Sequence, residues 1–431
     1  MDIIEIINKK RFGKKLSKEE LEFFIAGICS GKIKDYQATS LLMAICINDI
    51  DFDETYNLTM AMAHSGKILN LDDIGICIDK HSTGGVSDTT TLVVVPTLAS
   101  LGVKIAKMSG RSLGWTGGTA DKLEVFKGYK TEISTDEFKK NIKNNGASII
   151  SQSDEFALAD KILYKLRSNS ATVDNIGLIA SSIMSKKIAC GAKILLLDVK
   201  FGTGAFMKTC EDSKKLANTM VEIGKRAGIK VCAVISSMDQ PLTQFVGNNL
   251  EVYSAIKTLQ GEQNSLFDLS VYLCAKALML ENKCKTLKEG IELSKNEILS
   301  GRANLKLKQI ISSQFGSTEV IDNPKLLLPQ NKSFDVLSDN DGYVVDMNTA
   351  LIGYTAHDLQ KHNGLIVRQD DVGVVLNKKI GDKVKCGEKL LTVYYNNIEN
   401  INEVKTKFKD SFKIGNFKRE VKLVEEVIDW G

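Results

Sequence analysis

Residues 79–91, DKHSTGGVSDTTT, gather side chains that can hold an oxyanion. The stretch places a lysine, a histidine, a glycine pair and several hydroxyl groups between two apolar runs. A glycine-bearing turn between a strand and a helix offers backbone N–H groups and the positive end of the helix dipole to an anion. Lys80 would add charge, and Ser82 and Thr91 would donate hydrogen bonds. The same hydroxyl groups would also suit helix capping alone, so this stretch by itself leaves both interpretations open.

A second turn of similar composition lies in residues 107–124, KMSGRSLGWTGGTADKLE. It follows another short apolar run and contains Lys107, Ser109 and Thr119 together with a second glycine pair. Turns that follow neighbouring parallel strands meet at the carboxyl edge of the sheet, where α/β proteins bind ligands. Two such turns favour an oxyanion site over two capped helices. Neither turn matches the GxxxxGK[ST] phosphate loop.

A third group of polar side chains occurs at helical spacing further along the chain. Tyr164 and Arg167 are three residues apart, and Ser182 and Lys186 are four apart, so each pair shares a helix face. Arginine and lysine donors beside a serine hydroxyl suit a ring that carries carbonyl acceptors. A solvated helix face is the alternative. The small and apolar neighbours in IASSIMSKKIA favour a half-buried site.

Histidine is scarce in this chain, which narrows the search for a catalytic imidazole. Its four histidines are His64, His81, His357 and His362. Only His81 stands inside a cluster of other polar groups, within the first of the two turns. If the chemistry needs a histidine, His81 is the candidate.

The helices and strands that must position these groups are predicted from changes in residue pattern along the chain. The first 66 residues show helical periodicity, and from about residue 72 short β-branched runs alternate with helical ones. A helical piece interrupts that alternation, and strand-like alternation with turn signals marks the end of the chain. We expect an α/β protein with an all-α domain, an α/β domain on a parallel or mixed sheet, and a C-terminal α+β domain. The expected boundaries are 1–66 with 156–191, then 72–155 with 192–330, then 336–431.

Composition excludes several classes of function. The formal net charge of +4 is spread over 431 residues, which argues against a nucleic-acid partner. No apolar run approaches the length of a membrane span, and the N-terminal residues do not resemble a secretory signal. The nine cysteines have no metal-binding spacing, which is typical of reduced thiols. We expect a cytoplasmic protein without a membrane or nucleic-acid partner.

These motifs resemble those of the pyrimidine-nucleoside phosphorylases, the family that includes thymidine phosphorylase. DKHSTGGVSDTTT, SGRSLGWTGGTADKLE, YKLRSNSATV and LIASSIMSKKIA occur in the family's order and spacing, and the resemblance covers nearly the whole chain. It implies reversible phosphorolysis of uridine, thymidine and deoxyuridine to the free base and (deoxy)ribose 1-phosphate. Phosphate would be the co-substrate, with no required cofactor. Because the family is dimeric, a homodimer is expected.

The resemblance also implies a role for each motif residue. A lysine at position 107 resembles the pattern of the pyrimidine-nucleoside phosphorylases with broad substrate range more than that of the thymidine-restricted members, which usually lack a lysine there. His81 would bond the base carbonyl near the scissile bond and would act in catalysis with Arg167 and Lys186. The phosphate-binding residues would be Lys80, Ser82, Thr91, Lys107, Ser109 and Thr119. The pyrimidine-binding residues would be Tyr164, Arg167, Ser182 and Lys186.

Four positions depart from the family pattern. Ser87 stands where the family has glycine and Ser254 where bacterial members tend to have glutamate, and both belong to a potassium site of some relatives. That site would comprise Ser87, Thr89, Leu242, Phe245 and Ser254, with the leucine and phenylalanine ligating through backbone oxygen. Ser112 replaces a glycine and Trp115 a histidine. These two changes put domain closure and substrate range in question.

Two alternatives to the leading function stay open at this point. The first keeps the fold and phosphorolysis but shifts the substrate to a modified nucleoside or a nucleoside monophosphate, as Ser112 and Trp115 suggest. The second is a catalytically silent homologue that binds nucleoside. The presence of motif residues on both the phosphate and the pyrimidine side argues against a silent homologue.

Overall fold

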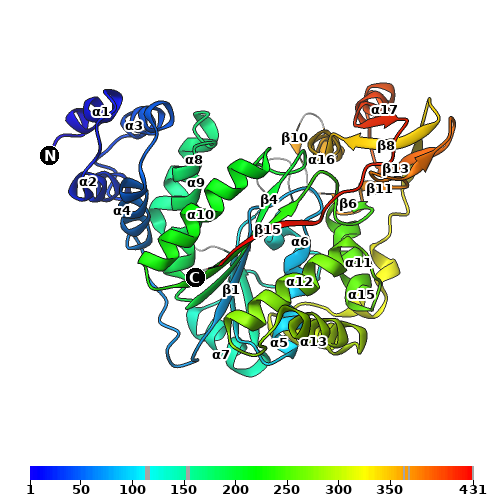
Figure 1. The fold of residues 1–431 in the computed structure, drawn as a ribbon, viewed down its shortest axis with the longest axis horizontal. Coiled ribbons are helices and arrows are strands. Elements are labelled where there is room, and N and C mark those ends of the chain that lie inside the picture. The colour runs from blue at the N-terminus through cyan, green and yellow to red at the C-terminus, as the bar shows by residue number, and fades with distance from the viewer. Residues whose placement is uncertain (112–116, 152–155, 363–364, 367–368, 430–431) are drawn as a thin grey trace.

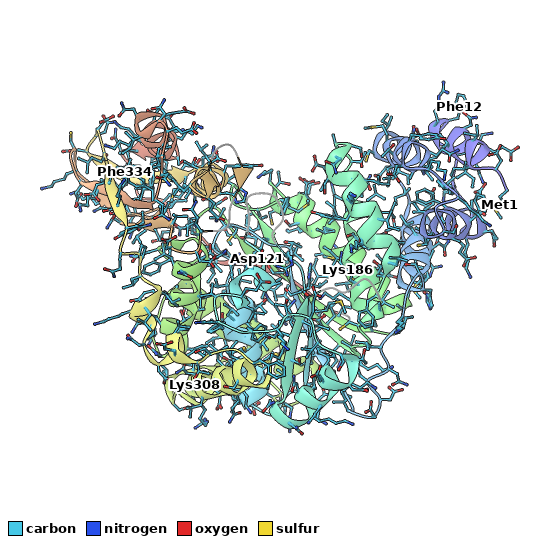
Figure 2. All side chains as sticks on the ribbon, turned by 180° about the vertical axis from the view of Figure 1, so that it is seen from behind. Met1, Phe12, Asp121, Lys186, Lys308 and Phe334 are labelled. Carbon is cyan, nitrogen blue, oxygen red and sulfur yellow. The ribbon has the colours of Figure 1, made fainter. Side chains whose placement is uncertain are left out.

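The computed structural model of the chain describes residues 1–111, 117–151, 156–362, 365–366 and 369–429. Figure 1 shows a central sheet with the N-terminal helices at one end and the C-terminal strands at the other. Seen from behind in Figure 2, these two parts rise on opposite sides of the central body. The expected fold class is confirmed: helical, α/β and strand-rich parts follow one another along the chain.

The N-terminal part is entirely helical, as the periodicity predicts. Ser17 and Glu20 form a capping box that fixes the start of its second helix. These helices share an apolar core with two helices from later in the chain, to which α8 contributes Ala159 and Leu163 and α9 contributes Leu178. The six helices are α1 (Ile3–Arg11), α2 (Lys18–Cys29), α3 (Asp35–Asn48), α4 (Phe52–Ala63), α8 (Leu158–Asn169) and α9 (Ile176–Ala189).

Helix α9 belongs to two cores at once. Its Leu178 packs with the N-terminal helices, whereas its Ala180, Ile183 and Met184 pack against the central sheet and α10 (Cys210–Arg226). The helix is therefore the direct structural link between the helical part and the sheet.

The central sheet has six strands in the order β15-β5-β4-β1-β2-β3. Five of them run parallel, and β15 pairs antiparallel with β5 at one edge. The sheet is thus mixed, and its parallel strands are joined by helices in the βαβ manner. The strands are β1 (Ile78–Ser82), β2 (Ile105–Ser109), β3 (Ala147–Ser151), β4 (Ile194–Phe201), β5 (Lys230–Ser237) and β15 (Val424–Asp429).

Helices cover the sheet and bury its apolar side chains. The largest core joins β1, β2, β4 and β5 to α5, α11, α12 and α14. Besides α10, the helices of this part are α5 (Thr90–Ser100), α6 (Thr119–Leu123), α7 (Thr135–Asn145), α11 (Asn248–Leu259), α12 (Ser265–Leu280), α13 (Leu287–Leu299), α14 (Arg302–Ser313) and α15 (Glu319–Asp322), with a 3-10 turn at Pro324–Leu327.

The C-terminal part is built from short strands and two helices. One of its sheets has the order β6-β11-β13-β7, the other β12-β8-β14, and β9 pairs with β10. Its elements are β7 (Lys332–Leu337), β8 (Gly342–Met347), α16 (Thr349–Asp358), β9 (Lys361–His362), β10 (Leu365–Ile366), β11 (Gly373–Leu376), β12 (Lys383–Val384), β13 (Lys389–Tyr395), α17 (Ile401–Asp410) and β14 (Phe412–Gly415).

Two strands cross between the parts, which the expected boundaries did not include. Strand β6 (Phe245–Val246) comes from the α/β segment and pairs with β11. Strand β15 comes from the segment 336–431 and completes the central sheet. Each exchange covers a strand edge whose backbone groups would otherwise lack partners. Among the described residues, no helix is long and apolar enough to cross a membrane.

Candidate active site

A cleft of about 460 Å³ lies between the carboxyl ends of β1 and β2 and the helices α8 and α9. Its size suits a small organic ligand. Figure 2 labels Lys186 on α9, on the helical side, and Asp121 in α6, on the sheet side. The two turns predicted to bind an anion and the helical cluster predicted to bind a ring therefore face one cavity.

Five of the six predicted phosphate-binding side chains line this cleft. They come from the end of β1, the first turn of α5, the end of β2 and the start of α6. The N-terminus of α5 opens at the cleft beside Thr91, and the positive end of the helix dipole favours an anion there. The five residues are Ser82, Thr91, Lys107, Ser109 and Thr119.

Lys80, the sixth predicted phosphate ligand, does not line the cleft. Its side chain is 1% exposed, and its amine donates to the Thr90 hydroxyl at 2.5 Å and lies 3.7 Å from Asp198. The buried carboxylate of Asp198 also pairs with Lys200 at 2.8 Å. A buried carboxylate needs a cation nearby, and this need draws the Lys80 amine beneath the cleft rather than into it.

Asp88 orients one of the hydroxyl groups in the cleft. The Ser82 hydroxyl donates to one oxygen of Asp88, while the other oxygen accepts from the backbone and the hydroxyl of Thr90. Burial raises the pKa of Asp88, but the nearby amines of Lys200 and Lys80 outweigh burial and hold the pKa well below its usual range. Asp88 therefore stays ionised and acts as an acceptor that fixes Ser82.

Lys107 is the lysine that reaches the anion side of the cleft. Its amine donates to the Met108 carbonyl at 3.2 Å and lies 3.9 Å from Asp79. Burial and the neighbouring charge of Lys187 lower the pKa of Lys107 to about 7. The amine can therefore gain or lose its charge near neutral pH, and an anion beside it favours the charged form.

The predicted ring-binding residues Tyr164, Arg167, Ser182 and Lys186 all line the opposite side of the cleft. The Arg167 guanidinium donates to the carbonyls of Thr172, Val173 and Leu178 at 3.1, 2.8 and 3.0 Å. Three of its five N–H donors are thus committed to backbone, which leaves two for a ligand. This anchoring fixes both the arginine and the loop between α8 and α9.

Lys186 is held by two neighbours on the helical side. Its amine donates to Asp160 at 2.5 Å and to the Ser182 hydroxyl at 3.0 Å. The sequence reasoning missed Asp160, although its position was readable: Asp160, Tyr164 and Arg167 are spaced i, i+4, i+7 on α8 and so share one face.

His81 lines the cleft close to several lysines. Burial, and then the positive charges of Lys187 and Lys107, keep the pKa of His81 well below its usual range. The imidazole is therefore neutral at pH 7, with one N–H to donate and no proton to release as an acid.

Lys187, which the sequence reasoning also missed, ties the two sides of the cleft together. From α9 it donates to Asp79 on β1 at 2.7 Å and to the Met108 carbonyl on β2 at 2.8 Å. Both partners of this ion pair are nearly fully buried. No signal in the sequence separated Lys187 from its neighbour Lys186, because the pairing joins residues more than a hundred positions apart.

The five positions of the expected potassium site are connected only in part. The Ser87 hydroxyl lies 3.4 Å from that of Thr243, next to Leu242. Within the described residues, the hydroxyl oxygens of Thr89 and Ser254 are buried without a hydrogen-bond partner. These are neutral oxygen donors, which potassium accepts.

The charges around these positions argue against the ion. None of the five residues is a carboxylate, and the Leu242 carbonyl already accepts a hydrogen bond from the Lys379 amine at 3.2 Å. A second cation on the same carbonyl would be repelled by that ammonium. By this chemistry the donor set does not fit potassium. The other two departures, Ser112 and Trp115, lie outside the described residues.

Comparisons with known proteins give the following matches. Residues 4–66 match the helical bundle domain of the glycosyl transferase family, and residues 75–304 match its a/b domain. Residues 367–415 match the pyrimidine nucleoside phosphorylase C-terminal domain. Each match falls on one of the three parts of the fold.

The chain is also similar to curated proteins over almost its full length. It is 47% identical over 420 residues to a pyrimidine-nucleoside phosphorylase of Staphylococcus haemolyticus, which covers 96% of each chain. It is 46% identical over 434 residues to one of Staphylococcus aureus strain USA300, covering 99% of this chain and all of the relative. A solved anthranilate phosphoribosyltransferase from Thermus thermophilus matches 73% of this chain and all of its own, at a TM-score of 0.61 and 20% identity, and so shares the fold.

Proposed function

The chain belongs to the pyrimidine-nucleoside phosphorylase family, and from this premise we propose that it cleaves uridine, thymidine and deoxyuridine by direct attack of phosphate on C1′. It is a pentosyltransferase that carries out phosphorolysis of pyrimidine nucleosides. The products are the free base and ribose or deoxyribose 1-phosphate. The observation that carries the proposal is the single cleft with anion-binding groups on one side and ring-binding donors on the other.

On the sheet side, the cleft residues bind and orient phosphate. Lys107 supplies charge, while the hydroxyl groups of Thr91 and Ser109 supply hydrogen-bond donors. Orientation of the nucleophile before attack removes much of the entropic barrier of a reaction between two molecules. Lys80 supports this side indirectly, since it neutralises the carboxylates beneath the cleft.

On the helical side, the donors stabilise the departing base. Negative charge builds on the pyrimidine as the bond to C1′ breaks, and Arg167 and Lys186 direct cationic donors at the cleft. Donors placed in advance at such a charge lower the barrier by about 3 kcal/mol each. His81 is neutral and serves as a hydrogen-bond donor to the base carbonyl.

The proposed reaction uses groups of the chain itself beside its co-substrate, phosphate. The cation that would face the phosphate is the Lys107 amine, so the proposal calls on no further cofactor. The attack inverts C1′, so a β-nucleoside gives an α-sugar phosphate.

The substrate range is tested by initial rates of base release with phosphate present and absent. We expect phosphate-dependent rates with uridine, deoxyuridine and thymidine, and no turnover of AMP. A rate with AMP or a modified nucleoside that exceeds those with the three pyrimidine nucleosides would favour the shifted-substrate alternative. Absence of turnover with every nucleoside would favour the silent homologue.

The same proposal includes a homodimer formed by the N-terminal helices. Tyr36, Met43 and Ile47 lie on one face of α3 and are 70%, 39% and 74% exposed, and Phe12 at the end of α1 is 70% exposed. Contiguous exposed apolar side chains of this kind mark an interaction surface. Light scattering should give twice the chain mass, and Ile47→Lys should give the monomer. A monomeric wild-type protein would contradict the dimer.

A cytoplasmic location also belongs to the proposal. All nine cysteines are free, and five of them are buried, as expected of a protein that matures under reducing conditions. Fractionation of cells with an antibody to the protein would test it.

A further inference from the structure

Asp160 is a buried carboxylate in the ring-binding half of the cleft. The residue is 2% exposed and lines the cavity from α8. One oxygen, Oδ2, accepts from the Lys186 amine at 2.5 Å. The other, Oδ1, has no hydrogen-bond partner within the described residues. A buried acceptor without a donor is costly, so this oxygen calls for a donor from a ligand.

The charged groups around Asp160 are donors. Lys186 and the two uncommitted N–H groups of Arg167 carry positive charge toward the same half of the cleft. The Ser182 oxygen already accepts from Lys186 at 3.0 Å, which leaves its hydroxyl hydrogen to be donated. Beside these donors, Asp160 provides a negatively charged acceptor that the Lys186 amine holds in place.

Pyrimidine bases differ in the pattern that they present to such a site. Uracil and thymine carry two carbonyl acceptors with the N3–H donor between them. Cytosine instead has a lone pair at N3 and an amino group at C4. A carboxylate oxygen attracts the N3–H of the first pattern and repels the N3 lone pair of the second.

We propose that Asp160 Oδ1 accepts a hydrogen bond from the N3–H of the bound base and thereby selects uracil and thymine against cytosine. The inference rests on the proposed function, because it assigns a specificity residue to the same cleft. The Lys186 ammonium neutralises the carboxylate, so its charge does not oppose the negative charge that builds on the leaving base. Asp160 thus positions Lys186 with Oδ2 and accepts the N3–H of the base with Oδ1.

The test measures the inhibition constants of uracil and cytosine for wild type, Asp160→Asn and Asp174→Asn. Asp174 also lines the cleft but is exposed, so its variant is a matched control. An asparagine can turn its amide to serve either base. We expect Asp160→Asn to reduce the preference for uracil over cytosine at least ~10-fold, and Asp174→Asn to leave it unchanged.

A purely structural role would give another pattern. If Asp160 only positions Lys186, the variant loses affinity for both bases by the same factor, and the inference is overturned. Phosphate affinity within about 2-fold of wild type would show that Asp160→Asn is folded. Should that variant not fold, Asp160→Ser keeps a neutral acceptor and is subject to the same comparison.

The wild-type enzyme provides an independent check that needs no variant. It should bind 3-methyluracil, which lacks the N3–H, at least ~100-fold more weakly than uracil. Equal binding of the two would overturn the role of Asp160. If wild type instead converts no pyrimidine nucleoside at all, the proposed function fails first, and the two failures remain distinguishable.

Discussion

At the scale of single residues, the buried partners of each charged side chain in and beneath the cleft determine its position and its protonation state. Lys80 and Lys107 each belong to one of the two glycine-bearing motifs, yet one neutralises carboxylates beneath the cleft and the other reaches the anion side. His81 is kept neutral by burial and by the lysines around it. Two lysines in similar motifs therefore take different roles, because their buried neighbours differ.

Lys107 should make phosphate binding depend on pH. Since its pKa is lowered to about 7, the amine is charged below that pH and neutral above it in the free enzyme. We expect the KM for phosphate to rise as the pH increases from about 7 to about 9, although the phosphate dianion becomes more abundant. Lys107→Met should raise the KM about 10-fold at a pH of about 6.5 and remove this dependence.

The control for that experiment is Lys104→Met. Lys104 precedes the same strand, but its amine donates to the Ile74 carbonyl and it does not line the cleft. Its profile should follow wild type. Identical pH profiles for wild type and Lys107→Met would refute the role of Lys107.

Arg167→Lys should separate the two halves of the site. A lysine cannot reproduce the planar guanidinium that bonds three carbonyls and a ligand at once. We expect kcat to fall by about 100-fold while the phosphate dissociation constant changes less than about 3-fold. Calorimetry with phosphate and steady-state rates would measure both. Equal losses in turnover and phosphate affinity would contradict the division of the cleft into two sides.

The site residues that could be predicted from the sequence are those marked by a short-range pattern, such as helical spacing or the end of a strand. Arg167 and Ser182 stand at helical spacing from their partners, and Ser82 and Ser109 end neighbouring strands. Asp160 and Lys187 were missed because their significance depends on contacts with Lys186 and Asp79, which only the folded chain reveals. The burial of Lys80 has the same origin, because no local pattern indicates that Asp198 lies beside it.

At the scale of elements, the site depends on where strands end and helices begin. The two glycine-bearing turns were placed correctly, because apolar runs bounded by glycine and hydroxyl residues mark both ends of a βα unit. The pairing of β15 with β5, and of β6 with β11, was not predicted. Such pairings join residues far apart in the chain, and short strands carry no signal that names their partner.

The segment between β11 and β12 supplies Lys379 to the α/β part, and this contact predicts that activity is independent of potassium. Burial lowers the pKa of Lys379 to about 8, so its ammonium is charged at pH 7 while it bonds the Leu242 carbonyl. We expect equal thermal midpoints and equal rates in potassium, sodium and choline chloride at constant ionic strength. A saturable rise in the midpoint with potassium alone would contradict the prediction.

Variants sharpen the potassium experiment. Lys379→Met should lower the thermal midpoint, because it leaves the Leu242 carbonyl without its donor. Lys378→Met is the matched control, since the Lys378 amine bonds Lys383 and Glu388 within the C-terminal part. It should behave as wild type.

At the scale of the whole molecule, the cleft lies where the helical part meets the sheet, and a few buried contacts hold the two in register. Helix α9 packs into both cores. The Lys187–Asp79 pair fastens it to β1 within the cleft wall. The strand-rich part is joined to the α/β part by β6, by β15 and by the Arg419–Asp239 pair.

Breaking the Lys187–Asp79 pair should therefore loosen the whole molecule. Lys187→Met leaves a buried carboxylate without its closest cation and should lower the free energy of unfolding by about 3 kcal/mol. The double variant Lys187→Met/Asp79→Asn removes both charges and should recover part of that loss. Denaturant unfolding of wild type, the two single variants and the double variant measures the cycle. Losses that simply add would show that the pair does not couple the two parts.

The proposed phosphorolysis is tested most directly by a ³¹P and ¹H NMR time course of uridine with phosphate and the purified enzyme. Direct attack by phosphate predicts that uracil and α-ribose 1-phosphate appear together in equal amounts, at a rate that falls to zero without phosphate. It also predicts that added uracil and α-ribose 1-phosphate regenerate uridine. Release of free ribose, formation of the β-anomer, or uracil release that does not need phosphate would contradict direct attack of a phosphate held opposite the base.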